Sequence, residues 1–312
     1  MDPSKMDVWD FMTPDDVTAA FKEGSIKNII PSSLFLKLKS DLTTLKARLV
    51  VHGDRQILSE LFGSNSSPTI NINVLLTALS LAAKEGYDFE SVDVTAAYLN
   101  APLTEPEHMR LSADLSKILV EAVPSRSMYL DKNGTIVVRL KKALYGLKNS
   151  GKLWYQELNN FMSENHFERS NIDKCLYTRR DGDKVTHALV YVDDILLIGN
   201  DKAFRTSIKR KLSNRFKRIT QQTENDIVFL GMHIQKTKTG DITVDQHAMI
   251  NEFIKEYKVT DSSTTPAAAN ILNQHISESS APPSDTAFKY RFLNMKLLYL
   301  ATRTSAIFYS PR

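Results

Sequence analysis

Two adjacent carboxylates, Asp193 and Asp194, interrupt a long apolar stretch of the chain. They follow Tyr191 and Val192 in the run 187–200, whose other members are mostly apolar or β-branched. This pattern predicts two short buried strands with the acid pair at the bend between them. Burying two anions is costly unless a cation neutralises them, and carboxylate oxygens suit Mg²⁺. The pair is therefore a candidate metal site, and the alternative is an ordinary turn, in which Asp is common.

A third acid, Asp93, lies far upstream in the segment Phe89–Thr95, which is predicted to be a strand. Apolar residues at helical spacing, among them Trp154 and Leu158, then predict a helix over 150–165. A strand, a helix and an acidic hairpin in this order form a βαββ arrangement, called a palm, that brings three distant carboxylates onto one sheet surface. Phosphoryl transfer by two metal ions needs that geometry.

The composition bounds the class of protein. A chain of 312 residues can form one large domain or two to three lobes. Its formal net charge of +4 permits a polyanionic partner without requiring one. A single cysteine, Cys175, excludes an internal disulfide framework and fits a reducing compartment. No apolar run approaches the ~18 residues of a membrane-spanning helix, and the acidic N-terminus is not that of a signal peptide.

Further elements surround these motifs. Helical spacing predicts helices over 71–84, 202–219 and 250–257, and a hairpin is expected to join 229–234 to 242–244. Residues 101–135 are expected to be mostly loop, because they contain three prolines. The helix over 202–219 carries eight cations and no acid, which favours contact with a phosphate backbone over a merely solvated face. Residues 261–286, rich in Ser, Thr, Ala and Pro, are typical of a linker.

Five segments, in this order, resemble motifs of the reverse transcriptases of Ty1/copia-type LTR retrotransposons. The resemblance runs from Lys46 to Lys258, with a weaker similarity at Tyr290–Leu300. One such motif would be weak, but five in the right order are very specific. The segments are Lys46–Val50 (fingers strand), Ser91–Asn100 (first catalytic motif), Leu140–Ser150 with Trp154-Tyr155 (template and nucleotide positioning), Tyr191–Asp194 (catalytic hairpin) and Phe229–Ile234 (primer-grip hairpin).

The resemblance implies an α+β fold, a right-hand polymerase with fingers, a βαββ palm and a small thumb, followed by a C-terminal linker and helix. Residues 1–40 would form an N-terminal extension and residues 41–262 the fingers, palm and thumb. Residues 263–286 would be a linker, and residues 287–312 a truncated helix like the one that connects the polymerase to the next domain.

The implied activity is RNA-directed DNA synthesis with two Mg²⁺ ions, for which Mn²⁺ could substitute. Asp93 and Asp193 would be the main metal ligands and Asp194 an auxiliary one. Tyr98 would lie beneath the sugar and reject a ribose 2′-hydroxyl, so that deoxynucleotides are used. The dNTP would be bound by Lys46, Arg48, Val94, Thr95, Ala96, Ala97, Tyr98, Tyr145 and Gly146. The primer and template would contact Val192, Phe229, Leu230, Gly231, Met232 and His233.

The expected partners are an RNA or DNA primer-template and dNTPs, together with other Pol or Gag products of a retroelement, and no membrane. The expected location is intracellular, in cytoplasmic virus-like particles and in the nucleus. The oligomeric state stays open.

The C-terminal part departs from the family pattern. Met295 stands where a Gly is expected, and no acid cluster of an RNase H follows before Arg312. We therefore expect a polymerase fragment of a Pol polyprotein. The principal alternative is a catalytically silent remnant that binds nucleic acid or a partner. Another palm-containing nucleotidyltransferase is disfavoured, because it would not need Tyr98 and the Phe229–Ile234 segment together.

Overall fold

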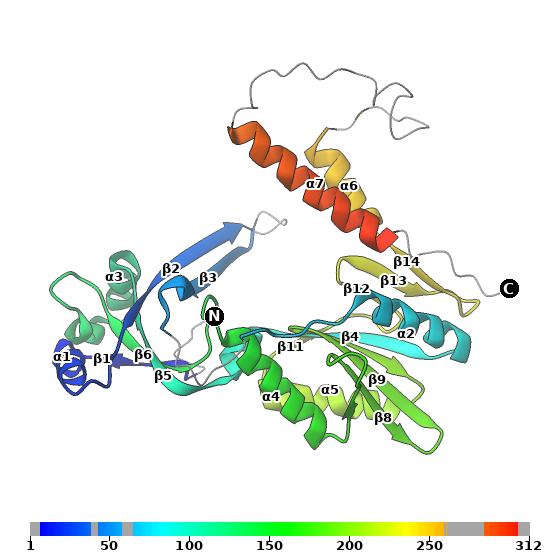
Figure 1. Cartoon of the computed structure of the whole chain (residues 1–312), viewed down its shortest axis with the longest axis horizontal. Helices are drawn as coiled ribbons and strands as arrows, with labels where there is room; N and C mark the ends of the chain where they lie inside the picture. The colour runs from blue at the N-terminus through cyan, green and yellow to red at the C-terminus, as the bar shows by residue number, and fades with distance from the viewer. Residues whose placement is uncertain (1–6, 39–42, 58–64, 259, 261–283, 305–312) are drawn as a thin grey trace.

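The structure is a computed structural model that describes residues 7–38, 43–57, 65–258, 260 and 284–304. It mixes helices with three sheets, and the two larger sheets lie at opposite ends of the long axis (Figure 1). Two separate hydrophobic cores accompany these two sheets. None of the helices in the described ranges combines the length and apolar character needed to cross a membrane.

The first sheet has five strands, all from the N-terminal half of the chain. Its order is β1 (Trp9–Met12), β6 (Val137–Lys142), β5 (Pro102–Arg110), β2 (Ile29–Leu38) and β3 (Leu45–Val51). The helices α1 (Pro14–Lys22) and α3 (Ala113–Ala122) lie at its outer end (Figure 1). Strands β1 and β2 fall within residues 1–40, and both are members of this sheet.

Strands β2 and β3 form a long ribbon with two unlike faces. Directly opposite residues of an antiparallel pair project to the same side. Leu36 pairs with Ala47 on one side of the ribbon, whereas Lys37 pairs with Lys46 and Phe35 with Arg48 on the other. The alternation of the two sequences therefore gathers the cations Lys46 and Arg48 on one face.

The second sheet has six strands, all antiparallel to their neighbours. Its order is β11 (Ile219–Gln221), β4 (Asp88–Val94), β10 (Asp194–Gly199), β9 (Lys184–Tyr191), β8 (Leu176–Asp181) and β7 (Glu168–Arg169). Strands β4 and β10 are almost entirely buried, and β10 has the continuous apolar run that such burial favours, whereas β4 also carries acids. The predicted order of the strand that carries Asp93, a helix and an acidic hairpin is confirmed by β4, α4 and β9–β10, although β4 also carries Asp88 and Glu90.

Helices α2 (Ile72–Glu85), α4 (Ser150–Glu164) and α5 (Lys202–Phe216) pack around this sheet (Figure 1). An aromatic cluster joins α4 to α5, because the ring of Phe216 lies 5.0 Å from that of Trp154 and 5.4 Å from that of Phe161. Helix α2 begins at the Asn71 cap and ends at Gly86, which adopts a left-handed backbone with φ of +68°.

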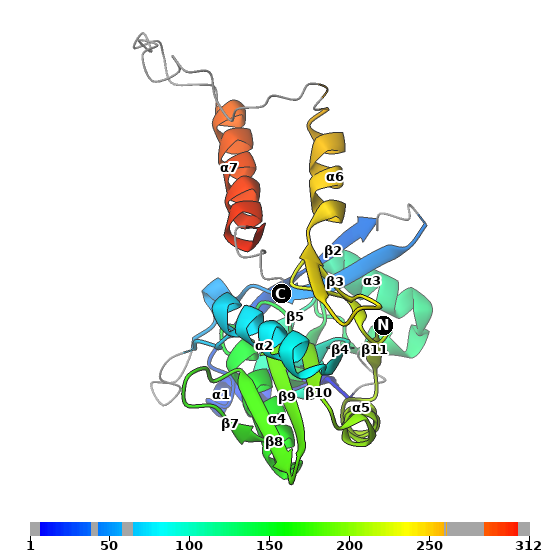
Figure 2. The ribbon, with the colours of Figure 1, turned by 90° about the vertical axis from the view of Figure 1, so that its right-hand side faces the viewer.

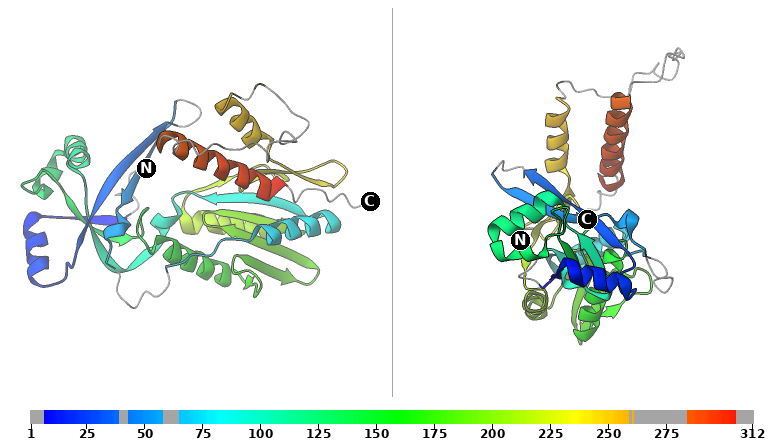
Figure 3. Two further views of the ribbon diagram at one scale, coloured as in Figure 1. Left: turned by 45° about the horizontal axis from the view of Figure 1, so that its top comes forward. Right: turned by 90° about the vertical axis from the view of Figure 1, so that its left-hand side faces the viewer.

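The third sheet is small and carries two helices. It comprises β12 (Asp226–Phe229), β13 (Met232–Lys236) and β14 (Ile242–Asp245). Helices α6 (His247–Glu256) and α7 (Ser284–Thr304) stand side by side beyond it, as Figures 2 and 3 show. Lys296 of α7 forms an ion pair with Glu256 of α6. Together they extend away from the main body of the molecule.

Several predicted elements differ from the structure. Residues 101–135 are not mostly loop, because they contain β5 and α3. The helix predicted over 202–219 ends at Phe216, where Lys217 adopts φ of +61° and Ile219 opens strand β11. The segment 229–234 is not one strand, since Leu230 and Gly231 form a tight turn between β12 and β13. The predicted linker lies outside the described residues except for 284–286, which open α7.

Candidate active site

The hairpin of β9 and β10 places the acid pair at its tight turn. Tyr191 pairs with Asp194, so Val192 and Asp193 form a two-residue loop. On the other side of β10, Asp194 pairs directly with Asp93 of β4. Opposite residues in an antiparallel pair share one face of the sheet. The pairing of β4 with β10 therefore brings acids from three sequence positions to one end of the sheet.

The turn has an uncommon backbone. Val192 adopts φ of +57°, a left-handed conformation that a β-branched residue rarely takes. Two-residue hairpin loops favour positive φ at their first position, because that turn matches the twist of the strands. The backbone N–H of Val94, the residue after Asp93, donates to the carbonyl of Asp193 at 2.9 Å. That bond ties the turn to the end of strand β4.

Burial and neighbouring negative charge raise the pKa of both Asp193 and Asp194. Burial is the main cause of the raised pKa of Asp193, and the neighbouring Asp93 raises it further, while Lys46 and Arg48 act in the opposite direction. The pKa of Asp194 is raised to about 6, by burial and by the charges of Asp193 and Asp93. The site thus holds anions at a cost that a bound cation would relieve.

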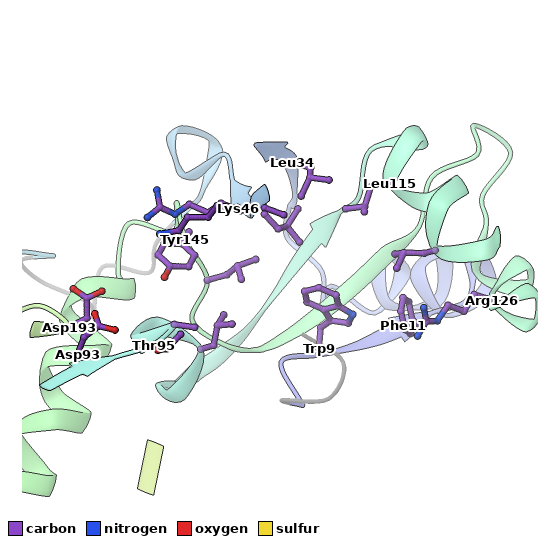
Figure 4. A pocket seen from close by; sticks show the side chains of 17 residues that line it. Trp9, Phe11, Leu34, Lys46, Asp93, Thr95, Leu115, Arg126, Tyr145 and Asp193 are labelled. Carbon is purple, nitrogen blue, oxygen red and sulfur yellow. The ribbon is translucent and has the colours of Figure 1, made fainter. Parts of the chain in front are cut away.

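A cavity of about 530 Å³ opens in front of Asp93 and Asp193, whose carboxylates lie side by side in Figure 4. Lys46, Thr95 and Tyr145 are drawn at the same end of it, and Arg48 and Ala96 also line the cavity. The opposite end reaches Phe11 and Arg126, which are drawn at the far side of the close-up. Cations from β3 therefore face the carboxylates within a single cavity.

Two tyrosines stand beside the carboxylates. The rings of Tyr98 and Tyr145 make an edge contact at 5.1 Å, and the guanidinium of Arg48 lies 5.8 Å from the ring of Tyr145. Burial, together with the negative charge of Asp193, raises the pKa of both tyrosines. Both phenols therefore remain neutral and protonated at physiological pH.

Gly146 follows Tyr145 in a conformation that suits glycine, with φ of +95°. A Cβ at this position would collide with the backbone of Val51 in β3. The backbone N–H of Val51 also donates to the carbonyl of Tyr145 at 2.8 Å. The structure thus gives Gly146 a packing role against β3, in addition to the contact with a dNTP that the resemblance implies.

Not every predicted site residue lies at this cavity. Asp194 is absent from its lining, and Val94 and Ala97 are buried in the core. The predicted primer residues other than Val192, which lies in the β9–β10 turn, belong to the three-stranded sheet or its turn. Phe229 and Met232 are buried there, Leu230 and Gly231 form the turn, and both ring nitrogens of His233 contact carboxylates, at 2.7 Å from Asp226 and 3.1 Å from Asp245.

One polar neighbour of the carboxylates was not predicted from the sequence. The hydroxyl of Thr220, on strand β11, donates to Oδ1 of Asp93 at 2.9 Å. Thr220 pairs directly with Asp93 because β11 extends the sheet beside β4. No motif marks this residue, which falls just past the predicted helix over 202–219.

The fit of these residues to a divalent metal rests on Asp93 and Asp193. Both carboxylates line one cavity, both are hard oxygen donors, and the charge of Asp93 adds to the raised pKa of Asp193. Within the described residues, no three His, Cys, Asp or Glu side chains are grouped closely enough to hold one ion. The donors present therefore fit Mg²⁺ as a pair that leaves further positions for water and substrate phosphates.

Carboxylates that face cations across a cavity are typical of enzymes that transfer phosphoryl groups. Comparison with known proteins gives the family. The chain belongs to the reverse transcriptase (RNA-dependent DNA polymerase) family, whose model matches residues 22–269.

Curated relatives are Pol polyproteins of Ty1/copia-type elements. The polyprotein of transposon TNT 1-94 from Nicotiana tabacum is 30% identical over 75% of this chain. That of transposon RE1 from Arabidopsis thaliana is 31% identical over 65%, and the Ty1-NL2 Gag-Pol polyprotein of Saccharomyces cerevisiae is 28% identical over 82%. The chain spans only 17%, 13% and 14% of these relatives, respectively.

Among solved structures, a telomerase from Candida albicans in complex with a telomeric RNA fragment aligns with a TM-score of 0.40 and 10% identity. The alignment covers 97% of this chain and 58% of that one.

Proposed function

We propose that this chain is the polymerase part of a Ty1/copia-type Pol polyprotein and adds dNTPs to a primer 3′-end on an RNA or DNA template. One observation carries the proposal: Asp93 and Asp193, from distant segments, line one cavity together with Lys46 and Arg48. A triphosphate needs cations around its oxygens and a metal held by carboxylates, and this cavity offers both kinds of group.

The carboxylates and the nearby cations have separate roles in this proposal. Asp93 and Asp193 would hold two Mg²⁺ ions, and Asp194, which lies outside the cavity lining, would be an auxiliary ligand from β10. When bound, the metal supplies activation of the primer 3′-hydroxyl and stabilisation of the charge on the transferring phosphoryl group. Lys46 and Arg48 bind the triphosphate. Arg48 forms bidentate hydrogen bonds with it, and Lys46 acts as a point charge. The backbone of residues 94–97 approaches the phosphates closely because its side chains are small.

The tyrosines select and position the nucleotide in this proposal. Tyr98 lies under the sugar and excludes a 2′-hydroxyl, and Tyr145 stacks on the incoming base or the template. Val192, at the tip of the acidic hairpin, contacts the primer terminus.

The remaining elements take the parts of a right-hand polymerase. The five-stranded sheet forms the fingers, the six-stranded sheet the palm, and the three-stranded sheet with α6 and α7 the grip and thumb. The primer-template then lies between the β2–β3 ribbon and helices α6 and α7, which all rise on the upper side of the molecule in Figure 1. We propose that residues 229–233 support the primer strand from the turn between β12 and β13.

A primer-extension assay tests the proposal. The purified chain is given Mg²⁺, dNTPs and a DNA primer annealed to an RNA or a DNA template. We expect extension on both templates and none with Asp193→Asn, which keeps the shape of the side chain but removes its charge. Salt-dependent binding of the primer-template without any incorporation by the wild-type chain would instead favour the silent, nucleic-acid-binding alternative.

A further inference from the structure

The loop between β9 and β10 is held from two sides. The indole Nε1 of Trp154, in helix α4, donates to the carbonyl of Val192 at 2.7 Å. The N–H of Val94 donates to the next carbonyl, that of Asp193, at 2.9 Å. Because both peptide groups that flank Asp193 are held, its φ and ψ are held as well. The direction in which its carboxylate leaves the backbone is therefore set by two hydrogen bonds.

The backbone of Val192 makes this restraint necessary. Its φ of +57° is unfavourable for a β-branched residue, so the loop tends to relax to another conformation. Such conformations persist only where the surrounding structure over-determines them. A relaxing loop would rotate the peptide between Val192 and Asp193 and turn the carboxylate away from Asp93.

Trp154 is itself a rigid donor. Its side chain is 1% exposed, and its ring contacts Phe216 of α5 edge-on at 5.0 Å. A buried indole N–H needs some acceptor, and many carbonyls would satisfy it. Here the acceptor belongs to the residue next to Asp193, so the aromatic cluster of α4 and α5 fixes the loop in space.

We propose that Trp154 is a positioning residue for catalysis: its indole N–H holds the Val192–Asp193 peptide so that the Asp193 carboxylate faces Asp93. The inference rests on the polymerase function proposed above. Trp154 touches no substrate in this scheme and acts through the loop alone.

The first test replaces Trp154 by Phe, which keeps an aromatic ring in the cluster and removes the N–H. We expect single-turnover incorporation to slow by roughly tenfold to a hundredfold, the loss that a misplaced catalytic group causes. Affinity for the primer-template without metal should stay within about twofold, because the lost interaction serves only the reaction and not ground-state binding. An incorporation rate within about twofold of the wild type would overturn the proposal, since this lies below the loss that misplacement causes.

A matched control and a second replacement separate positioning from folding. Tyr177→Phe removes another buried aromatic donor to α4, the hydroxyl that donates to Asn159 at 3.2 Å far from the loop, and should leave incorporation unchanged. If Trp154→Phe does not fold, benzothienylalanine at position 154 keeps the bicyclic ring with sulfur in place of N–H. It should fold and still show the slower incorporation, and wild-type rates for this variant would refute the role of the N–H.

A double-mutant cycle with Val192→Gly tests the mechanism. Glycine adopts the left-handed conformation without strain, so the loop should keep its shape without the indole. When Val192→Gly is also present, Trp154→Phe should therefore slow single-turnover incorporation by less than about threefold, because the effects of coupled residues are not additive. A penalty that is undiminished in the double variant would contradict the proposal.

One readout is independent of activity. The chain contains two tryptophans, so a ¹⁵N spectrum shows two indole N–H signals, and Trp154→Phe identifies the one from Trp154. We expect this proton to exchange slowly, whereas rapid exchange would exclude the hydrogen bond. If the wild-type chain incorporates no nucleotide but this proton is protected, the proposed function fails while the structural restraint stands.

Discussion

Asp194 is the carboxylate of the site for which the shift in pKa is large. Its pKa rises from the ordinary 3.8 to about 6, through burial and the charges of Asp193 and Asp93. Between these two pH values the folded chain binds a proton that the unfolded chain has already released. The free energy of unfolding therefore falls as pH rises from about 4 to about 6, and the loss persists at higher pH.

We expect Asp194→Asn to stabilise the chain at neutral pH, because it removes a charge that burial and two neighbouring anions disfavour. After allowance for solvent screening, the gain in the free energy of unfolding should be about 1–2 kcal/mol at pH 7.5 and close to zero at pH 4. Urea unfolding at the two pH values measures it. An equal gain at both would show that charge is not the cause.

Tyr98 gives a second prediction at this scale. It contacts Tyr145 beside the carboxylates, where it would meet the sugar of a nucleotide. We expect Tyr98→Ala to raise incorporation of ribonucleotides relative to deoxynucleotides by at least about tenfold, because removing a steric barrier abolishes discrimination against the larger sugar. Competition between the two nucleotides for one primer end measures this ratio. An unchanged ratio would contradict the proposal that Tyr98 excludes the 2′-hydroxyl.

The sequence predicts some of these residues and not others, for a physical reason. Asp93 and Asp193 stand out because acids in buried apolar strands need compensation, and the structure places both at one cavity. Thr220 carries no such mark, and Trp154 stands out only as part of the helical stripe and of the motif that follows Ser150. Their hydrogen bonds to Asp93 and Val192 depend on which strand borders β4 and on how α4 packs, and neither follows from local sequence.

At the scale of elements, α5 is anchored by a buried cation. Arg205 is fully buried and forms ion pairs with Glu90 at 3.1 Å and Glu224 at 2.9 Å, and it also donates to the carbonyl of Gly199. Lys209 pairs with Glu90 as well. Several cations of the basic helix that was predicted to bind phosphates therefore form ion pairs within the protein. The exposed Arg210 is among the cations that remain accessible to a phosphate backbone.

We expect Arg205→Ala to lower the free energy of unfolding by about 3–5 kcal/mol, because it removes one of the two cations that pair with the buried Glu90. Arg210→Ala, on the exposed side of the same helix, is the matched control and should change stability by less than about 0.5 kcal/mol. Denaturant unfolding compares the two variants. Similar losses in both would mean that the buried ion pairs do not anchor α5.

The three-stranded sheet should respond to pH through His233. Hydrogen bonds from its ring to Asp226 and then to Asp245 raise its pKa above the ordinary 6.5. Because the pKa of His233 is higher in the folded chain than in the unfolded chain, its protonation stabilises the folded chain fully below about pH 6.5. This stabilisation is lost as pH rises through the pKa of His233 in the folded chain. Amide exchange in β12–β14 should therefore quicken at high pH beyond its intrinsic rate, and His233→Gln should remove that excess. An excess that survives the substitution would exclude His233 as the cause.

Elements with strong periodicity and clear ends were predicted well. The helices expected over 71–84 and 150–165 correspond to α2 and α4. Both were recognisable because each has an apolar stripe, and cap residues mark the two ends of α2. Strand β5 contains prolines and charges and shows no alternation, so residues 101–135 gave no strand signal. The end of α5 was missed because Lys217, not a glycine, adopts the positive φ that stops it.

At the scale of the molecule, α7 contacts the three-stranded sheet although it lies outside the segment that matches the family model. The hydroxyl of Tyr299 donates to the carbonyl of Leu230 at 2.6 Å, at the turn between β12 and β13. A Cβ on the adjoining Gly231 would come within 2.8 Å of that hydroxyl. Helix α7 thus packs against the turn predicted to support the primer, and in the proposed polymerase it would extend the thumb beyond α6.

We expect Gly231→Ala to loosen this contact, because it adds a clash and a residue unsuited to φ of +71°. Hydrogen exchange of α7 should quicken, and Tyr299→Phe should have a smaller effect in the same direction. Gly240→Ala serves as the control, since its backbone is also left-handed but nothing lies near its Cβ. Equal effects in the Gly231 and Gly240 variants would argue against docking of α7.

Asp93 and Asp193 are proposed to act together at one cavity as the carboxylates that bind the catalytic metal ions. Every other role assigned to the site depends on this. The most direct measurement is single-nucleotide incorporation by the wild type, Asp93→Asn, Asp193→Asn and the double variant. We expect each single change to reduce the rate at least about 10³-fold and the double change to cost little more, because groups that act as a unit are not additive. Independent losses that multiply, or a single variant that keeps near-normal rates, would contradict the claim.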